Sequence, residues 1–243
     1  SSDLDYASTS ALALNGGTIN DANGNAATLT LAAVGQANSL GANKALVIDG
    51  VVPTVTNVTS TTSNGTLKLG ESAAITVTFS EAVTVSGTPR LTLETGSSDA
   101  VVDYASGSGG TTLTFNYTVA SGHVSSDLDY ASTSALALNG GTINDANGNA
   151  ATLTLAAVGQ ANSLGANKAL VIDGVVPTVT NVTSTSNNGT YKLGDVVPIT
   201  VTFSEAVTVT NTPQLTLETG SSDAVVDYAS GSGGTTLTFN YTV

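Results

Sequence analysis

The residues best suited to chemistry in this sequence are oxygen-bearing side chains around a turn. The segment Asp145-Ala146-Asn147-Gly148-Asn149 places a carboxylate and two amides at alternate positions, and residues 21–25 repeat it. Calcium prefers six to eight hard oxygen ligands from carboxylates, amides and backbone carbonyls. The segment alone supplies too few of them, so Glu81 after a predicted strand and Asp173 in a linker are the expected contributors. The pattern predicts a calcium site formed by Glu81, Asp145, Asn147 and Asp173.

A second explanation of the same segment needs no metal. Asp and Asn side chains accept hydrogen bonds from their own backbone in tight turns, and Gly adopts the positive φ that such turns require. The residues alone leave the turn and the calcium site both open. Asp127 and Asp129 form a further acidic pair on one face of a predicted strand, where we expect them to be solvated rather than to bind a metal.

Other kinds of site find little support in the residue types. The chain has no Cys and a single His, His123, and a Ser-His-Asp site would need that His between an acid and a nucleophile. Residues 106–110 are rich in Gly but contain no Lys, and a strand rather than a helix is expected after them. They therefore predict a hairpin loop and not a phosphate-binding loop. We expect the protein not to be an enzyme.

Composition excludes several further classes. Charged residues make up 9% of the chain, against roughly 25% in an ordinary soluble domain, and β-branched Thr and Val dominate while strong helix formers are scarce. Eighteen acidic and five basic residues give a net charge of −13, which leaves no basic surface for nucleic acid. No apolar run approaches the roughly 18 residues of a membrane helix. An acidic, Cys-free chain of this kind is typical of exported bacterial surface proteins.

The sequence repeats itself with a period of 124 residues. Residues 1–119 match residues 125–243 at 109 of 119 positions. The expected boundary is the turn-rich stretch 49–54, which recurs at 173–178. Residues 51–174 would then form a complete domain, 1–50 the C-terminal part of a preceding repeat, and 175–243 the N-terminal part of a following one. Near-identical neighbours indicate a longer array, from which this chain is a window.

Alternation of apolar and polar residues predicts strands at 75–80, 91–94 and 112–118. Further strands are expected near 54–59, 83–85, 100–104, 128–138, 152–155 and 169–172. About eight short strands separated by Gly and Asn turns predict an all-β, antiparallel β-sandwich, and no convincing helix is found. The side chains expected to face the core are Ile75, Val77, Phe79, Leu113, Phe115 and Tyr117.

The order and spacing of four strings resemble a known family. They are ITVTFSEAV at 75–83, DANGN at 145–149, SLGANKA at 163–169 and VID at 171–173. They resemble the tandem bacterial immunoglobulin-like repeats of very large secreted adhesins and surface fibre proteins. This resemblance covers essentially the whole chain and implies β-sandwich domains strung end to end outside the cell, often rigidified by calcium. The linker departs from the family pattern, because the usual Asp-Thr followed two residues later by Ala-Pro is here Asp-Gly-Val-Val-Pro.

Together these features predict a structural and adhesive module whose partners are neighbouring repeats of the same protein, joined head to tail in a stalk or fibre. Neither nucleic acid nor membrane insertion of this segment is expected. The alternative is a carbohydrate-binding β-sandwich module, although 5% aromatic residues and no Trp provide few sugar-stacking platforms. Residues 175–243 should be completed by a segment equivalent to 1–50, either covalently in a longer polypeptide or by strand donation between subunits.

Overall fold

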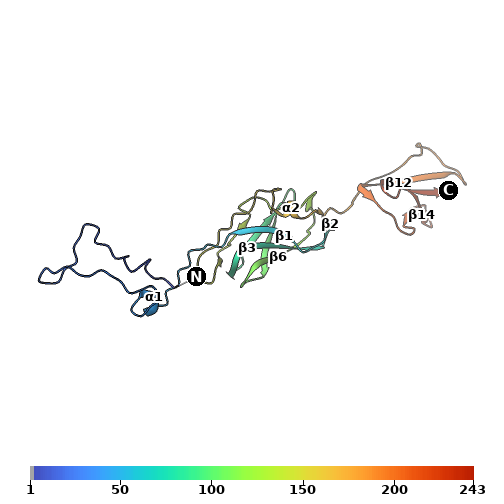
Figure 1. The fold of residues 1–243 in the computed structure, drawn as a ribbon. Coiled ribbons are helices and arrows are strands. Elements are labelled where there is room, and N and C mark those ends of the chain that lie inside the picture. The colour runs from blue at the N-terminus through green and yellow to red at the C-terminus, as the bar shows by residue number, and fades with distance from the viewer. Residues whose placement is uncertain (1–2) are drawn as a thin grey trace.

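The computed structural model describes residues 3–243 and consists almost wholly of β-structure. The prediction of an all-β fold with antiparallel sheets in a sandwich-like arrangement is confirmed. Figure 1 shows an elongated chain, in which the N-terminal segment and the C-terminal sheet lie at opposite ends of a central unit. Among the described residues there are two helices, each a single turn, α1 (Leu40–Asn43) and α2 (Leu164–Asn167).

The two short helices differ from the expectation of none, and their cause is local. In α2 the side chain of Ser163 accepts a hydrogen bond from the Ala166 N–H at 3.2 Å, which caps the first turn. Ser39 caps α1 in the same way. A single turn is too short to produce a helical apolar period, so the sequence pattern did not reveal it.

The central unit contains a seven-stranded antiparallel sheet. Its strands lie in the order β1-β3-β6-β5-β4-β8, and β9 also pairs with β3. The β5–β6 turn is the hairpin loop predicted at residues 106–110. The bounds are β1 (Val55–Ser60), β3 (Ser72–Ser86), β4 (Arg90–Leu93), β5 (Ala100–Ser106), β6 (Gly110–Thr118), β8 (Leu136–Ala137) and β9 (Thr142–Asn144).

A smaller sheet closes the end of the unit that faces the C-terminus. It has the order β2-β10-β7, with β2 (Gly65–Lys68), β10 (Leu170–Asp173) and β7 (Val124–Ser125). The β2–β10 pair is parallel, whereas the sequence predicted only antiparallel pairing. The long connection between these two strands allows the crossover that a parallel pair requires.

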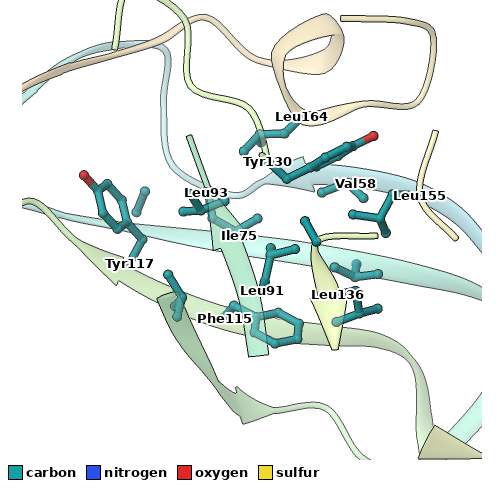
Figure 2. Packing of buried hydrophobic residues seen from close by; sticks show 14 of the residues in the cluster. Val58, Ile75, Leu91, Leu93, Phe115, Tyr117, Tyr130, Leu136, Leu155 and Leu164 are labelled. Atoms are coloured by element: carbon teal, nitrogen blue, oxygen red, sulfur yellow. The ribbon is translucent and has the colours of Figure 1, made fainter. Parts of the chain in front are cut away.

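The core lies between the large sheet and the chain that follows β6. The six side chains predicted to face inward are each at most 2% exposed, so that prediction is confirmed. Figure 2 shows Tyr130, Leu155 and Leu164 packed over Val58 and Ile75. We call residues 125–174 the covering segment, because its apolar side chains complete this core. Those that are buried are Leu128, Tyr130, Ala135, Leu136, Ile143, Leu155, Leu164, Leu170 and Ile172.

Most of the covering segment is irregular, which corrects two predicted strands. Within 128–138 the structure has only a bridge at Tyr130 and the two-residue β8, and within 152–155 only a bridge at Thr152. The Tyr130 hydroxyl donates to the Ala156 carbonyl at 2.6 Å, and Leu128 N–H donates to the Leu170 carbonyl at 2.8 Å. The apolar alternation therefore reflects burial of anchoring side chains and not a continuous ladder.

Residues 175–243 form one five-stranded sheet with the pairing of the central unit. Its order is β11-β12-β15-β14-β13, and its strands are β11 (Val179–Ser184), β12 (Val196–Val207), β13 (Gln214–Leu217), β14 (Ala224–Ser230) and β15 (Gly234–Thr242). Residues 3–50 copy 127–174 but hold only α1 and isolated bridges. Within the described chain no strand pairing or backbone hydrogen bond joins 3–50 to 175–243.

Candidate metal centre

Three carboxylates from separate parts of the chain meet at the end of the central unit that faces the N-terminal segment. They belong to Asp49 in the linker, Glu81 in β3 and Asp145 in the loop after β9. One oxygen of each lies within 4.8 Å of the others. We call these three residues the linker cluster. Such a cluster brings the hard oxygen ligands that calcium prefers to one point.

The loop around Asp145 is held by the carboxylate itself. Its Oδ1 atom accepts the backbone N–H groups of Asn147 at 2.9 Å and Asn149 at 2.8 Å, and its Oδ2 atom accepts the Asn149 side-chain amide at 2.7 Å. Gly148 has φ +92°, as the turn requires. Burial raises the pKa of Asp145. The hydrogen bonds from Asn149 and from the neighbouring backbone lower this pKa by more than burial raises it, so the net pKa lies below 3.8. Asp145 is therefore charged at neutral pH.

The copy of this loop shows which part of the site is local. Asp21 accepts the backbone N–H of Asn23 at 2.9 Å and both the backbone and side-chain N–H groups of Asn25, at 2.8 and 2.7 Å. The turn therefore forms in both copies, as the explanation without metal required. Asp21 is exposed, whereas Asp145 is only 6% exposed. The gathering of carboxylates is thus a tertiary feature added to a local turn.

Hydrogen bonds attach the linker to the unit that follows it. The Asn147 side-chain amide donates to Asp49 Oδ2 at 2.5 Å. Thr54 at the end of the linker and Ser80 in β3 are joined by two hydrogen bonds. Ser80 N–H donates to the Thr54 carbonyl at 2.8 Å, and Thr54 N–H donates to Ser80 Oγ at 3.0 Å. These contacts fix the position of the Asp49 carboxylate relative to β3.

Glu81 contributes the atom that lacks a partner. The pairing of β3 with β6 shifts register between Thr78 and Val83, so Glu81 lies in an irregular stretch of β3. Its Oε1 atom is buried and has no hydrogen-bond partner among the described residues, and the same holds for Glu205, its copy. A buried carboxylate oxygen without a partner is costly. A divalent cation within the linker cluster would supply that partner and offset the repulsion among three carboxylates, so the residues present fit calcium.

The structure brings together Glu81, Asp145 and Asn147 but not Asp173. Asp173 is exposed at the end of β10, opposite Lys68 and Val124, and accepts the Val175 N–H at 3.2 Å. Its copy Asp49 takes the expected place. The acid in the linker cluster therefore lies one period of 124 residues before Asp173, in the linker that precedes the central unit.

Asp129 also differs from the expectation of solvation. It is 6% exposed and accepts the N–H groups of Tyr130 at 2.9 Å and Gly159 at 3.0 Å. Its carboxylate therefore holds the covering segment in shape. Asp127 is exposed, as expected.

The single histidine and the aromatic side chains make structural contacts. His123 Nδ1 accepts the Ala120 N–H at 3.3 Å and lies 3.0 Å from the Tyr117 hydroxyl, whose pKa burial raises to about 12. All eleven Tyr and Phe side chains lie in the described part of the chain, and each is buried or half-buried. The two described helices, of four residues each, are too short to cross a membrane.

The fold and the linker cluster define an all-β, sandwich-like protein with an acidic centre between a linker and the unit it precedes. Comparison of the chain with models of known protein families and with curated proteins produced no match.

Proposed function

We propose that the chain is a structural and adhesive module, in which tandem immunoglobulin-like β-sandwich repeats form a long stalk or fibre on a bacterial surface and calcium rigidifies their linkers. The observation that carries this proposal is the linker cluster. One of its three carboxylates, Asp49, comes from the segment between repeats, and the other two come from the body of the next unit.

Rigidification follows from where the three carboxylates are attached. A cation bound to Asp49, Glu81 and Asp145 would tie the linker to β3 and to the loop after β9 at once. Without a cation the carboxylates repel each other, by roughly 1 kcal/mol per pair in water and roughly 3 kcal/mol near a protein surface. Nine acidic and three basic residues give residues 51–174 a net charge of −6, which adds to this repulsion.

The repeat makes the effect cumulative. The linker 49–54 is identical to 173–178, so each junction would take the same geometry and a series of junctions would form a straight or regularly curved rod. A rod of this kind holds a distal part of the protein away from the cell. The acidic, Cys-free composition and the resemblance to surface-fibre repeats support an extracellular location and an adhesive role.

The test measures shape and stability with and without calcium. Small-angle scattering and thermal unfolding of the chain in calcium should give a larger maximum dimension and a higher melting temperature than in chelator. Asp49→Asn should abolish most of both differences, whereas Asp99→Asn, at an exposed acid outside the cluster, should preserve them. Equal dimensions and equal melting temperatures of the unaltered chain in calcium and chelator would refute the calcium role.

A separate measurement distinguishes the structural spacer role from a carbohydrate-binding module. A glycan array that shows no binding, together with a rod-like scattering profile, supports a spacer function. Saturable binding to a defined glycan would instead favour a carbohydrate-binding module and overturn the proposal.

A further inference from the structure

A short loop between β6 and β7 holds the start of the linker that leaves the central unit. We call residues 120–123 the exit loop. Gly122 N–H donates to the Gly174 carbonyl at 3.0 Å, and Gly174 N–H donates to the His123 carbonyl at 2.7 Å. These two hydrogen bonds attach the linker to the exit loop just before the chain passes into residues 175–243.

The linker meets the exit loop backbone to backbone. Gly174 is buried, and a Cβ atom placed on it would collide with the Ala120 carbonyl oxygen and lie 2.9 Å from the His123 carbonyl oxygen. Backbone atoms cannot move aside as the end of a flexible side chain can. The direction in which the linker leaves the unit therefore depends on the shape of the exit loop.

The imidazole of His123 keeps the exit loop in that shape. Its Nδ1 atom accepts the Ala120 N–H at 3.3 Å and lies 3.0 Å from the Tyr117 hydroxyl oxygen. The two rings stack, with centroids 5.8 Å apart and planes 15° from parallel. Figure 2 shows Tyr117 at one edge of the core, with its hydroxyl directed away from the other labelled side chains. A backbone N–H only donates, so Nδ1 accepts this bond only in a neutral ring whose proton is on Nε2.

We propose that His123 is a pH-sensitive latch, and that protonation of its Nδ1 atom opens the exit loop and frees the linker to residues 175–243. An imidazolium donates from both nitrogens and accepts at neither. Its Nδ1–H would then face the Ala120 N–H, donor against donor. The Tyr117 hydroxyl can turn to accept from the imidazolium, whereas the Ala120 N–H cannot. Imidazole is the side chain that ordinarily changes charge between about pH 5 and 8.

Charged groups surround the exit loop on several elements. Asp99 and Asp103 line, together with His123, a cavity of about 340 Å³ beside β5 and β6. The titratable groups on all the elements around the loop are Asp99, Asp103, Tyr117, Lys68, Glu71, Glu94 and Asp173. Of these, only Tyr117 is hydrogen-bonded to the imidazole within the described part of the chain. The contacts that a proton on the ring would change are therefore the two at Nδ1.

The sequence makes this latch easy to observe in the full 243-residue chain. His123 is its one histidine, so the imidazole signals in nuclear magnetic resonance come from this residue alone. Their nitrogen shifts report both the tautomer and the charge of the ring. Residues 120–124 have no second copy, so peptides that contain them report on the exit loop alone. Hydrogen exchange of these peptides is measured in chelator from pH 7.5 to 5 and corrected for the intrinsic effect of pH on exchange.

Two substitutions of the same residue separate the latch from other effects of acid. His123→Asn places an amide oxygen near the position of Nδ1, where it accepts a hydrogen bond at every pH in this range. His123→Phe keeps a flat ring that can stack on Tyr117 but has no acceptor. All carboxylates of the chain are retained in both variants, so their titration is common to all three proteins.

We expect the imidazole at pH 7.5 to be neutral with its proton on Nε2, and the exit loop to be protected. Protonation should raise exchange of the loop roughly fivefold to tenfold, as expected for the loss of about one hydrogen bond. This change should have the same midpoint as the titration of the ring, and small-angle scattering should show a broader range of dimensions. The Asn variant should stay protected throughout, and the Phe variant should exchange at pH 7.5 as the unaltered chain does at pH 5.

Three results would overturn the latch, namely a ring that stays neutral down to pH 5, a ring that titrates while exchange of the loop is unchanged, or an Asn variant that opens as the unaltered chain does. The calcium role fails or stands separately. Asp49→Asn alters the linker at the other end of the central unit and should leave the pH response intact. A chain whose shape ignores calcium would still show the latch in chelator.

Discussion

The same leucine stands in two environments within one chain, which allows a matched test of how the covering segment contributes to stability. Leu128 is fully buried, and its copy Leu4, in identical local sequence, is 43% exposed. Leu128→Ala removes a core side chain and leaves a cavity, which costs roughly 3 kcal/mol. Leu4→Ala changes an exposed position in the N-terminal segment, outside the central unit, and should cost less than about 0.5 kcal/mol.

Hydrogen exchange read by mass spectrometry suits this comparison, at concentrations where the chain is monomeric. All ten differences between the two copies lie within residues 62–90 and their equivalents, so peptides that contain at least one differing position report on the central unit alone. Leu128→Ala should raise exchange of the slowest amides there by roughly a hundredfold, and Leu4→Ala should leave it unchanged. Equal exchange in the two variants would show that the covering segment does not stabilise the central sheet.

Two further predictions concern the linker cluster. Glu81→Gln removes one of the three negative charges that repel each other, so in chelator it should stabilise the central unit by roughly 1–2 kcal/mol. In calcium the same substitution should remove most of the stabilisation by the metal. Chemical denaturation in the two buffers measures both effects, and a loss of stability in chelator would contradict the repulsion. The pKa of Asp145 is lower in the folded chain than its ordinary 3.8, so its contribution is complete above the unfolded pKa and disappears as the pH falls through the folded value. Asp145→Asn should consequently lose less stability on acidification from neutral pH than the unaltered chain does, and parallel acid titrations of the two would contradict this assignment.

Strand positions with a clear apolar period were predictable. Ile75, Val77 and Phe79 alternate with Thr and Ser, and the pleat of a strand directs alternate side chains to one face. The same signal misled at 128–138, because Leu128 and Tyr130 are buried as isolated anchors at a sheet edge. A period of two reports which side chains are inward and does not report whether the backbone forms a ladder.

The candidate site was predictable in its residue types and only partly in its members. Glu81, Asp145 and Asn147 meet as expected, whereas Asp173 was assigned from its place in the same repeat. The linker runs on into the next unit and is hydrogen-bonded to it, so the acid that completes the cluster precedes the unit. That choice depends on which way the linker packs, and the local sequence contains no record of it.

Residues 3–50 and 127–174 separate the two contributions, because one sequence appears in two surroundings. In both, a Ser caps a single helical turn, an Asp closes the DANGN turn, and a Tyr hydroxyl donates to a carbonyl 26 residues later. The sequence by itself determined these features, since their partners lie within the same segment. The strands β8 to β10 and the burial of Leu128 exist in one copy only among the residues that the structure describes. Tertiary structure decided them, because a strand needs hydrogen-bond partners and a core needs an opposing face, and both come from residues 51–119.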